Sequence, residues 1–135
     1  MGWEHMDSAI KVLLFEDETL VAMFIQDALT DAGFEPVLAR NAKEAEGAIR
    51  DHIEVVSALV TDIRLGEGPS GWELARLARE RCPDLPIVFI SGDSAIDHSA
   101  QGVPDSVMIQ KPFVEAQLIT ALANLLNDRA PQPSD

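Results

Sequence analysis

The segment Leu59–Leu74, "LVTDIRLGEGPSGWEL", joins a short apolar run to the start of an amphipathic pattern through a loop rich in glycine. The apolar run ends at Asp62 and predicts a buried strand, because a strand covered on both faces does not need to alternate apolar and polar side chains. Ser70 and Glu73 have the spacing of a capping box, so a helix is predicted to begin at Gly71. The segment therefore predicts one strand–loop–helix unit.

The loop of this unit also contains the spacing G-x-G-x-x-G, formed by Gly66, Gly68 and Gly71. In a dinucleotide-binding loop the glycines lie directly in the strand-to-helix turn, whereas Gly66 comes four residues after Asp62. Glu67 would repel a pyrophosphate, and Pro69 lacks a backbone N–H donor. We therefore expect these glycines to give the loop positive φ angles beside a site, and not to bind a nucleotide.

The alternation of an apolar run and an amphipathic segment occurs about five times in the 135 residues. The predicted strands are Ile10–Phe15, Glu35–Ala39, Ser57–Asp62, Leu85–Ser91 and Ser106–Gln110. The predicted helices are about Thr19–Ala32, the segment "NAKEAEGAIRD" with a capping box at Asn41 and Glu44, Gly71–Arg81, a weak segment at Ser94–Gln101, and about Val114–Asn127. Such alternation predicts an α/β domain with a parallel sheet and helices on both faces.

Composition narrows the classes of function. The net charge of −13 opposes direct nucleic-acid binding, which depends on neutralising phosphates. No apolar run is long enough to span a membrane, and the single cysteine, Cys82, excludes an internal disulfide framework and fits the cytoplasm. We expect residues 1–9 to be an N-terminal extension, 10–128 one domain, and 129–135 a disordered tail.

Chemically active side chains follow the predicted strands at their carboxyl ends. They are Glu16 and Asp17 after the first strand, Asp62 at the end of the third, Ser91 and Gly92 at the end of the fourth, and Lys111 after the fifth. Ligands of open α/β sheets bind at this edge. Each residue alone could be an ordinary helix cap or loop residue, but together they predict a single site.

Three converging carboxylates would need a counter-charge. Two carboxylates about 4 Å apart repel by about 4 kcal/mol at an effective dielectric near 20. A hard divalent cation such as Mg²⁺ suits such a cluster, and Lys111 can supply a second positive charge. Asp62 is the best candidate for a nucleophile, because it stands alone on the central strand and could attack a phosphoryl group to form an acyl phosphate. The Ser91 hydroxyl and the Gly92 N–H would then help to neutralise the charge on the phosphoryl oxygens.

In this order, the pieces "VLLFEDE", "ALVTDIRLGEGPSGWEL", "PIVFISGD" and "VMIQKPF" resemble the receiver domain of bacterial two-component response regulators. The resemblance extends from about Lys11 to Asn127. It implies a (βα)5 doubly wound fold, in which a five-stranded parallel sheet has the flavodoxin-like order 2-1-3-4-5 and helices on both faces. The features resemble the stand-alone receivers common in alpha-proteobacteria, which carry no effector domain of their own.

The resemblance also implies a role for each site residue. Asp62 would be the phosphorylated aspartate, and Mg²⁺ would be bound by Glu16, Asp17, Asp62 and the backbone carbonyl of Arg64. The phosphoryl oxygens would be bound by Ser91, Gly92 and Lys111. The bond between Lys111 and Pro112 would be cis, as in that family.

This chain departs from the family's pattern at two positions. Glu16 stands where the first acid is commonly Asp. Met108 stands where the family usually has Tyr or Phe, so its side chain either fills the core or takes part in a conformational switch. We further hypothesise that Asp93, two residues after Ser91, tunes the lifetime of the acyl phosphate.

The sequence thus predicts a cytoplasmic phosphoacceptor of a two-component phosphorelay. Its predicted phosphodonor is a histidine kinase or a histidine phosphotransfer protein. The protein would be a monomer or weak homodimer and would act through protein–protein contacts, without binding nucleic acid directly and without binding a membrane. It would take part in its own phosphorylation and dephosphorylation without being a dedicated enzyme. One alternative is a phosphohydrolase of the haloacid-dehalogenase type, although Arg64 stands where that class has a second acid. The other is a receiver-like binding module that works without phosphorylation.

Overall fold

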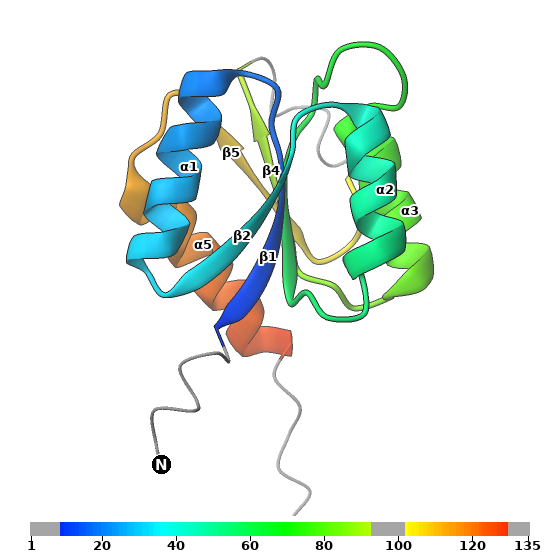
Figure 1. Cartoon of the computed structure of the whole chain (residues 1–135). Helices are drawn as coiled ribbons and strands as arrows, with labels where there is room; N and C mark the ends of the chain where they lie inside the picture. Colours follow the sequence, from blue (N-terminus) through cyan, green and yellow to red (C-terminus); the bar gives the residue numbers. More distant parts are fainter. Residues whose placement is uncertain (1–8, 93–101, 130–135) are drawn as a thin grey trace, which may run out of the picture.

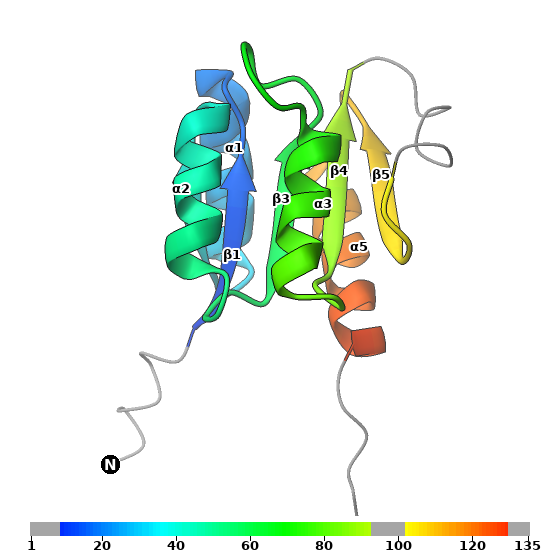
Figure 2. The ribbon, with the colours of Figure 1, turned by 90° about the vertical axis from the view of Figure 1, so that its right-hand side faces the viewer.

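A parallel sheet forms the centre of the protein, and a layer of helices covers each of its faces (Figures 1 and 2). The computed structural model describes residues 9–92 and 102–129. Within these ranges the sheet has five strands in the order β2-β1-β3-β4-β5. They are β1 (Ile10–Phe15), β2 (Phe34–Ala39), β3 (Ala58–Asp62), β4 (Ile87–Ser91) and β5 (Ser106–Gln110). The predicted fold class and strand order are confirmed.

The helices of the described ranges are α1 (Thr19–Asp31), α2 (Ala42–His52), α3 (Gly71–Arg81) and α5 (Glu115–Arg129). None of these helices is long and apolar enough to cross a membrane. Helix α5 continues past its predicted end at Asn127 and includes Arg129, which was expected to begin the tail. The Arg129 guanidinium donates hydrogen bonds to the Ser57 carbonyl oxygen (3.1 Å) and to an Asp84 carboxylate oxygen (3.2 Å). The predicted weak segment at 94–101 and the candidate residue Asp93 lie outside the described residues.

The strands are apolar along their whole length because both faces of the sheet are covered. Figure 2 shows α2 and α3 in front of the sheet and α1 and α5 behind it. Along β1, Leu13 and Phe15 join the core beneath α2 and α3, whereas Val12 and Leu14 join the core beneath α1 and α5. All residues of β3 and β4 are buried. This two-sided burial is the dominant favourable contribution to folding.

Hydrogen bonds at the helix starts explain why α2 and α3 begin where they do. Ser70 and Glu73 form the predicted capping box, with N–H to oxygen distances of 3.3 and 2.9 Å. At α2, the Asn41 side chain accepts the N–H of Glu44 (2.8 Å), as predicted. The return bond differs from the prediction, because the Glu44 carboxylate accepts the N–H of Arg40 (2.8 Å) and not that of Asn41.

The glycines in the loop after β3 and at the first position of α3 serve two structural purposes. Gly66 and Gly68 have φ angles of 85° and 98°, which confirms the predicted positive φ. Gly71 instead allows close approach, since its N–H donates to the Ile63 carbonyl oxygen (2.7 Å) and a Cβ atom here would overlap the carbonyl oxygen of Asp62. The first turn of α3 therefore rests directly on the backbone that leaves β3.

Replacing Gly71 with alanine should push α3 away from the end of β3. We expect Gly71→Ala to lower the free energy of unfolding by about 2 kcal/mol or more, because the added methyl meets backbone, which cannot rotate aside. Gly47→Ala within α2 is the matched control, since its Cβ would meet the mobile end of Arg50 and helix propensity favours alanine by up to about 1 kcal/mol. Urea denaturation measures both, and equal stability changes would contradict this account.

Candidate functional site

Described residues at and just after the carboxyl ends of β1, β3, β4 and β5 line a cavity at that edge of the sheet. This is the upper edge in Figure 2. The cavity is lined by Asp17, Glu18, Asp62, Arg64, Ser91, Gly92 and Lys111. The structure thus brings together the residues predicted from the strand ends. Glu16 is fully buried next to them.

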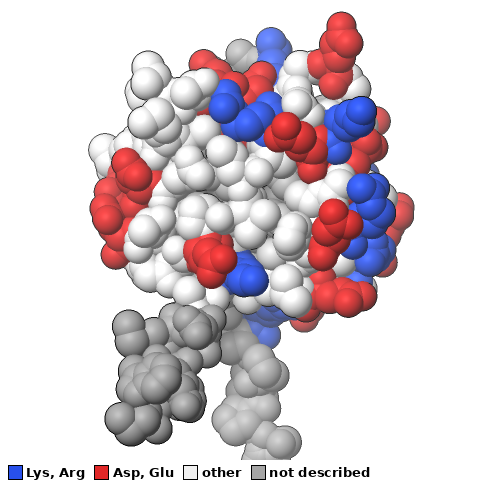
Figure 3. All heavy atoms as spheres, viewed as in Figure 1, with Lys and Arg blue, Asp and Glu red and all other residues white. Residues whose placement is uncertain are grey.

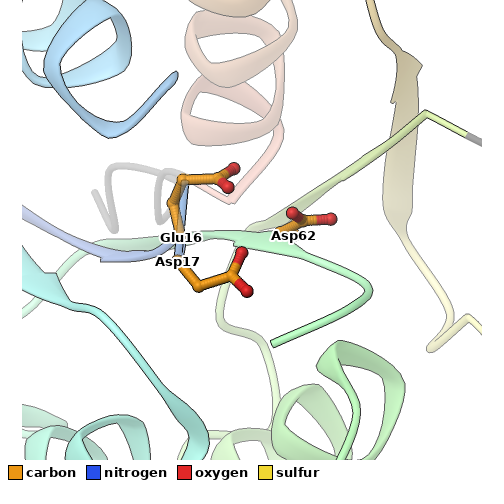
Figure 4. A group of neighbouring side chains, drawn as sticks. All are labelled: Glu16, Asp17 and Asp62. Atoms are coloured by element: carbon orange, nitrogen blue, oxygen red, sulfur yellow. The ribbon is translucent and has the colours of Figure 1, made fainter. Parts of the chain in front are cut away.

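Glu16, Asp17 and Asp62 form a compact acidic group. Each offers one carboxylate oxygen, and these oxygens all lie within 4.8 Å of one another. Figure 4 shows the three carboxylates extending to the same side, two from the end of β1 and one from the end of β3. Glu16 and Asp62 are buried, whereas Asp17 is exposed. Such an arrangement is stable only if protons or cations offset the repulsion between the acids.

Glu16 is the most perturbed acid of the group. Its Oε2 accepts the N–H of Glu18 (3.1 Å), while its Oε1 is buried and has no hydrogen-bond partner among the described residues. The Lys111 ammonium lies 3.5 Å from Oε1, close enough for ion pairing but outside hydrogen-bonding geometry. Burial, and then the charge of Asp62, raises the pKa of Glu16 to about 7. The group is therefore ready to hold either a proton or a cation.

Lys111 supplies the counter-charge from the end of β5. Its Nζ donates to Glu18 Oε1 (2.9 Å) and to Asp62 Oδ2 (3.1 Å). Burial by itself lowers the pKa of Lys111, but the hydrogen bonds to Glu18 and Asp62, together with the charges of Asp62 and Glu16, outweigh burial and raise the pKa above its usual value. Lys111 N–H also donates to the Ser91 carbonyl oxygen (2.8 Å), and the bond to Pro112 is cis. The ammonium is therefore charged and held against Asp62.

Asp62 lies at the end of the central strand, with its side chain 8% exposed. Its Oδ1 accepts the N–H of Arg64 (3.3 Å), and its Oδ2 faces Lys111. Ser91 is buried and lines the same cavity together with Gly92. A carboxylate with one oxygen held by a backbone N–H and the other by an ammonium keeps a defined orientation. A carboxylate oxygen held in this way is suited to attack an electrophile that enters the cavity.

Met108 lies away from these residues, within the layer between the sheet and helices α2 and α3. It pairs in register with Phe89 on β4 and packs, partly buried, against the core cluster that contains Phe89 and Trp72. Those two rings are in contact, with centroids 4.5 Å apart. This placement favours the interpretation of Met108 as core filling. A switch role stays a prediction.

Two residues at this edge, Glu18 and Arg40, are absent from the set predicted by the sequence. Glu18 is the third acid of "EDE" and contacts Lys111. Arg40 follows β2, and its guanidinium donates to the carbonyl oxygens of Glu16 (3.2 Å) and Asp17 (2.9 Å). The expectation that functional polar residues follow the strands would have identified Arg40 if it had been applied to β2 as well. Glu18 gave no signal of its own beyond its position next to the acidic pair.

Comparison with known proteins identifies the class of protein to which this fold and site correspond. Residues 12–123 match the family described as "Response regulator receiver domain". The chain belongs to this family. Receiver domains are signalling domains of two-component systems and not dedicated enzymes. They are phosphorylated by histidine kinases or phosphotransfer proteins, and they generally bind Mg²⁺ at an acidic site.

Relatives of different lengths share this domain. The response regulator receiver protein CpdR of Brucella abortus is 33% identical over 118 residues, covering 86% of this chain and 96% of that protein. A putative NtrX-like response regulator of Rickettsia typhi is 31% identical over 118 residues and 85% of this chain, which spans only 24% of that relative. The crystal structure of a receiver protein from Sinorhizobium medicae is 42% identical, with a TM-score of 0.86, and the match covers 90% of this chain and 98% of that chain.

Burial of Glu16 should make the stability of the metal-free protein depend on pH. A carboxyl whose pKa is about 7 in the folded state and 4.5 in the unfolded state binds more protons when folded, so the free energy of unfolding falls as the pH rises through this window. Glu16→Gln cannot ionise, and its side-chain oxygen can still accept the Glu18 N–H. We expect the stability of this variant relative to wild type to increase by roughly 1–3 kcal/mol between pH 5 and pH 8.

Urea denaturation in the presence of a chelator at the two pH values measures this change. Glu46→Gln, an exposed acid on α2, is the control and should show no comparable change. A constant difference between Glu16→Gln and wild type at both pH values would contradict a raised pKa at Glu16.

Proposed function

We propose that this chain accepts a phosphoryl group on Asp62 from the phosphohistidine of a histidine kinase or a histidine phosphotransfer protein. The observation that carries the proposal is the placement of the Asp62 carboxylate. It lines the cavity, lies 3.1 Å from the Lys111 ammonium, and belongs to an acidic group whose oxygens are within 4.8 Å of one another. Membership of the receiver family supports the same reaction class.

In the proposed reaction, an Asp62 oxygen forms a bond to phosphorus while the bond between phosphorus and the donor imidazole breaks. The electron pair of that bond returns to the imidazole nitrogen, and the product is an acyl phosphate. Lys111 stays protonated and neutralises charge on the phosphoryl oxygens. The Ser91 hydroxyl and the Gly92 N–H, which line the same cavity, would donate hydrogen bonds to those oxygens.

The residues present fit a Mg²⁺ ion. Carboxylate oxygens are the donors that this hard cation prefers, and the buried Oε1 of Glu16 has no hydrogen-bond partner among the described residues. Asp17, Asp62 and the Arg64 carbonyl oxygen would hold the ion, together with Glu16 directly or through water. When bound, Mg²⁺ supplies positive charge that offsets both the carboxylates and the phosphoryl oxygens.

The signal is proposed to leave the domain through altered affinity for a protein partner in the cytoplasm. A monomer or weak homodimer remains the predicted state. The phosphohydrolase alternative is disfavoured, because the chain belongs to the receiver family and Arg64 stands where that class has its second acid. A binding module that works without phosphorylation would have no use for a buried carboxylate paired with a lysine, so it is disfavoured as well.

Replacing the nucleophile tests the proposal directly. We expect acetyl phosphate to phosphorylate the wild-type protein only when Mg²⁺ is present, and Asp62→Asn to lose at least about 99% of the labelling, because an amide oxygen cannot form the acyl phosphate. Intact-protein mass spectrometry measures the added phosphoryl group. Asp51→Asn on α2, an exposed acid, is the control and should be labelled at the wild-type rate. Mg²⁺-dependent labelling of Asp62→Asn at the wild-type rate would refute the assignment.

A donor protein needs a surface beside the cavity, and an apolar patch lies there. We define the donor face as Leu20, Phe24 and Phe113, which line a hollow together with Lys111 and Pro112. Leu20 is 80% exposed, and the Phe24 and Phe113 rings are in contact, with centroids 5.6 Å apart. Figure 3 shows mostly uncharged atoms over the upper half of α1, the half nearer the site. Exposed apolar side chains that adjoin one another in this way are typical of protein interfaces.

A charge placed on the donor face should separate the two kinds of phosphodonor. We expect Leu20→Asp to slow transfer from a phosphorylated histidine phosphotransfer protein by roughly 10-fold or more, because a buried charge opposes docking. Its rate with acetyl phosphate should stay within about twofold of wild type. Val55→Asp is the control, since Val55 is 58% exposed after α2 at the opposite edge of the sheet. Equal slowing with both donors would contradict a docking role for Leu20.

A further inference from the structure

Arg40 connects the end of β2 to the acidic loop between β1 and α1. Its Nε donates to the Glu16 carbonyl oxygen (3.2 Å), and one terminal nitrogen donates to the Asp17 carbonyl oxygen (2.9 Å) and to the Thr19 hydroxyl (2.8 Å). These partners are 21 to 24 positions away in the sequence. A planar guanidinium with several fixed donors is suited to binding acceptors that lie side by side.

The backbone that carries Arg40 is itself held in place. The Arg40 N–H donates to the Glu44 carboxylate (2.8 Å), and Asn41 caps the following helix α2. One residue earlier, the Ala39 carbonyl oxygen accepts the N–H of Glu16 (3.0 Å), so the end of β2 and the start of the acidic loop are joined directly. The guanidinium therefore projects from a fixed point onto the loop.

The acidic loop between β1 and α1 needs such a support, because repulsion between carboxylates disfavours its conformation. Glu16, Asp17 and Glu18 are consecutive, and the carboxylate of Asp62 lies against the first two. Without an opposing interaction, repulsion would favour a backbone conformation that moves Asp17, which is exposed, away from Asp62. A bound guanidinium resists this movement.

The acceptors of Arg40 leave the carboxylates available. They are two main-chain carbonyl oxygens and a hydroxyl, and none of them is a carboxylate oxygen. Lys111 differs, because its ammonium pairs with the side-chain oxygens of Asp62, Glu18 and Glu16. Arg40 thus holds the backbone of the loop while the carboxylate of Asp17 faces the cavity.

We propose that Arg40 is a positioning residue that holds the loop 16–19 in the conformation that binds Mg²⁺. This inference rests on the proposed function. The two possible effects of Arg40 on Mg²⁺ affinity have opposite signs. A cation near a metal site weakens Mg²⁺ binding by repulsion, whereas a residue that preorganises the ligands strengthens it. Removing Arg40 therefore weakens Mg²⁺ binding if the proposal is right and tightens it if charge alone matters.

The test measures Mg²⁺ binding to folded variants by isothermal titration calorimetry. We expect Arg40→Ala to raise the dissociation constant by roughly 3- to 10-fold, the effect of losing hydrogen bonds that order a ligand loop. Arg40→Lys keeps the charge but not the fork of donors, so it should recover only part of the loss. Arg50→Ala is the matched control, since Arg50 is 71% exposed and pairs only weakly with Asp51 (3.6 Å); it should bind Mg²⁺ within about twofold of wild type.

Two further measurements separate positioning from a general loss of stability. The Mg²⁺ concentration that half-saturates phosphorylation by acetyl phosphate should rise in Arg40→Ala, while the rate at saturating Mg²⁺ stays within about twofold of wild type, because the bound ion then orders the loop itself. In the metal-free protein, amide hydrogen exchange should accelerate at residues 17–19 and stay unchanged in β3 and β4.

Opposite results would overturn the proposal. Mg²⁺ binding by Arg40→Ala that is equal to or tighter than wild type would refute it, as would unchanged exchange at residues 17–19. If Arg40→Ala does not fold, Arg40→Lys takes the same test, and wild-type binding and exchange in that variant would count against the proposal. Failure of the wild-type protein to bind Mg²⁺ would refute the proposed function instead, and the exchange measurement would still report whether Arg40 holds the loop.

Discussion

Repulsion among the carboxylates of Glu16, Asp17 and Asp62 is the constraint on which the rest of the site depends. These groups offer oxygens within 4.8 Å of one another, and two of the residues are buried. Three features of the surrounding structure offset that repulsion or hold the residues in place despite it. Lys111 supplies a charge to the side chains, Glu16 acquires a raised pKa, and a guanidinium holds the loop backbone. Each of these would be unnecessary if the acids were spread over the surface.

The parallel sheet makes this concentration of charge possible. Its strands end at one edge, and buried packing on both faces holds β1, β3, β4 and β5 in register. Asp62 then projects from the most central strand, while Lys111 arrives from the edge strand β5. The contact of Gly71 with the backbone after Asp62 fixes the loop on the other side. The rigidity of the core is thus transmitted to the carboxylate of Asp62.

The acidic group reduces the stability of the metal-free protein. Oε1 of Glu16 is buried without a hydrogen-bond partner among the described residues, and the pKa of Glu16 is raised to about 7. Both features, together with the closeness of the three carboxylates, disfavour the folded state when no metal cation is bound. The apolar strands beneath the site make up for this cost. A cation that binds only the folded protein would recover part of it, because such binding shifts the folding equilibrium. Stability and ligand binding are therefore linked through Glu16.

Local patterns in the sequence were sufficient for much of the molecule. Apolar runs located the strands, the Ser70–Glu73 capping box located the start of α3, and acids at strand ends indicated the site, because each of these signals arises between residues close in the chain. Only the tertiary structure decided which partners meet. The contact of Lys111 with Glu18 joins residues 93 positions apart, and that of Arg40 with Glu16 joins residues 24 apart. That Oε1 of Glu16 finds no hydrogen-bond partner among the described residues likewise depends on what surrounds it in space, which no spacing along the chain encodes.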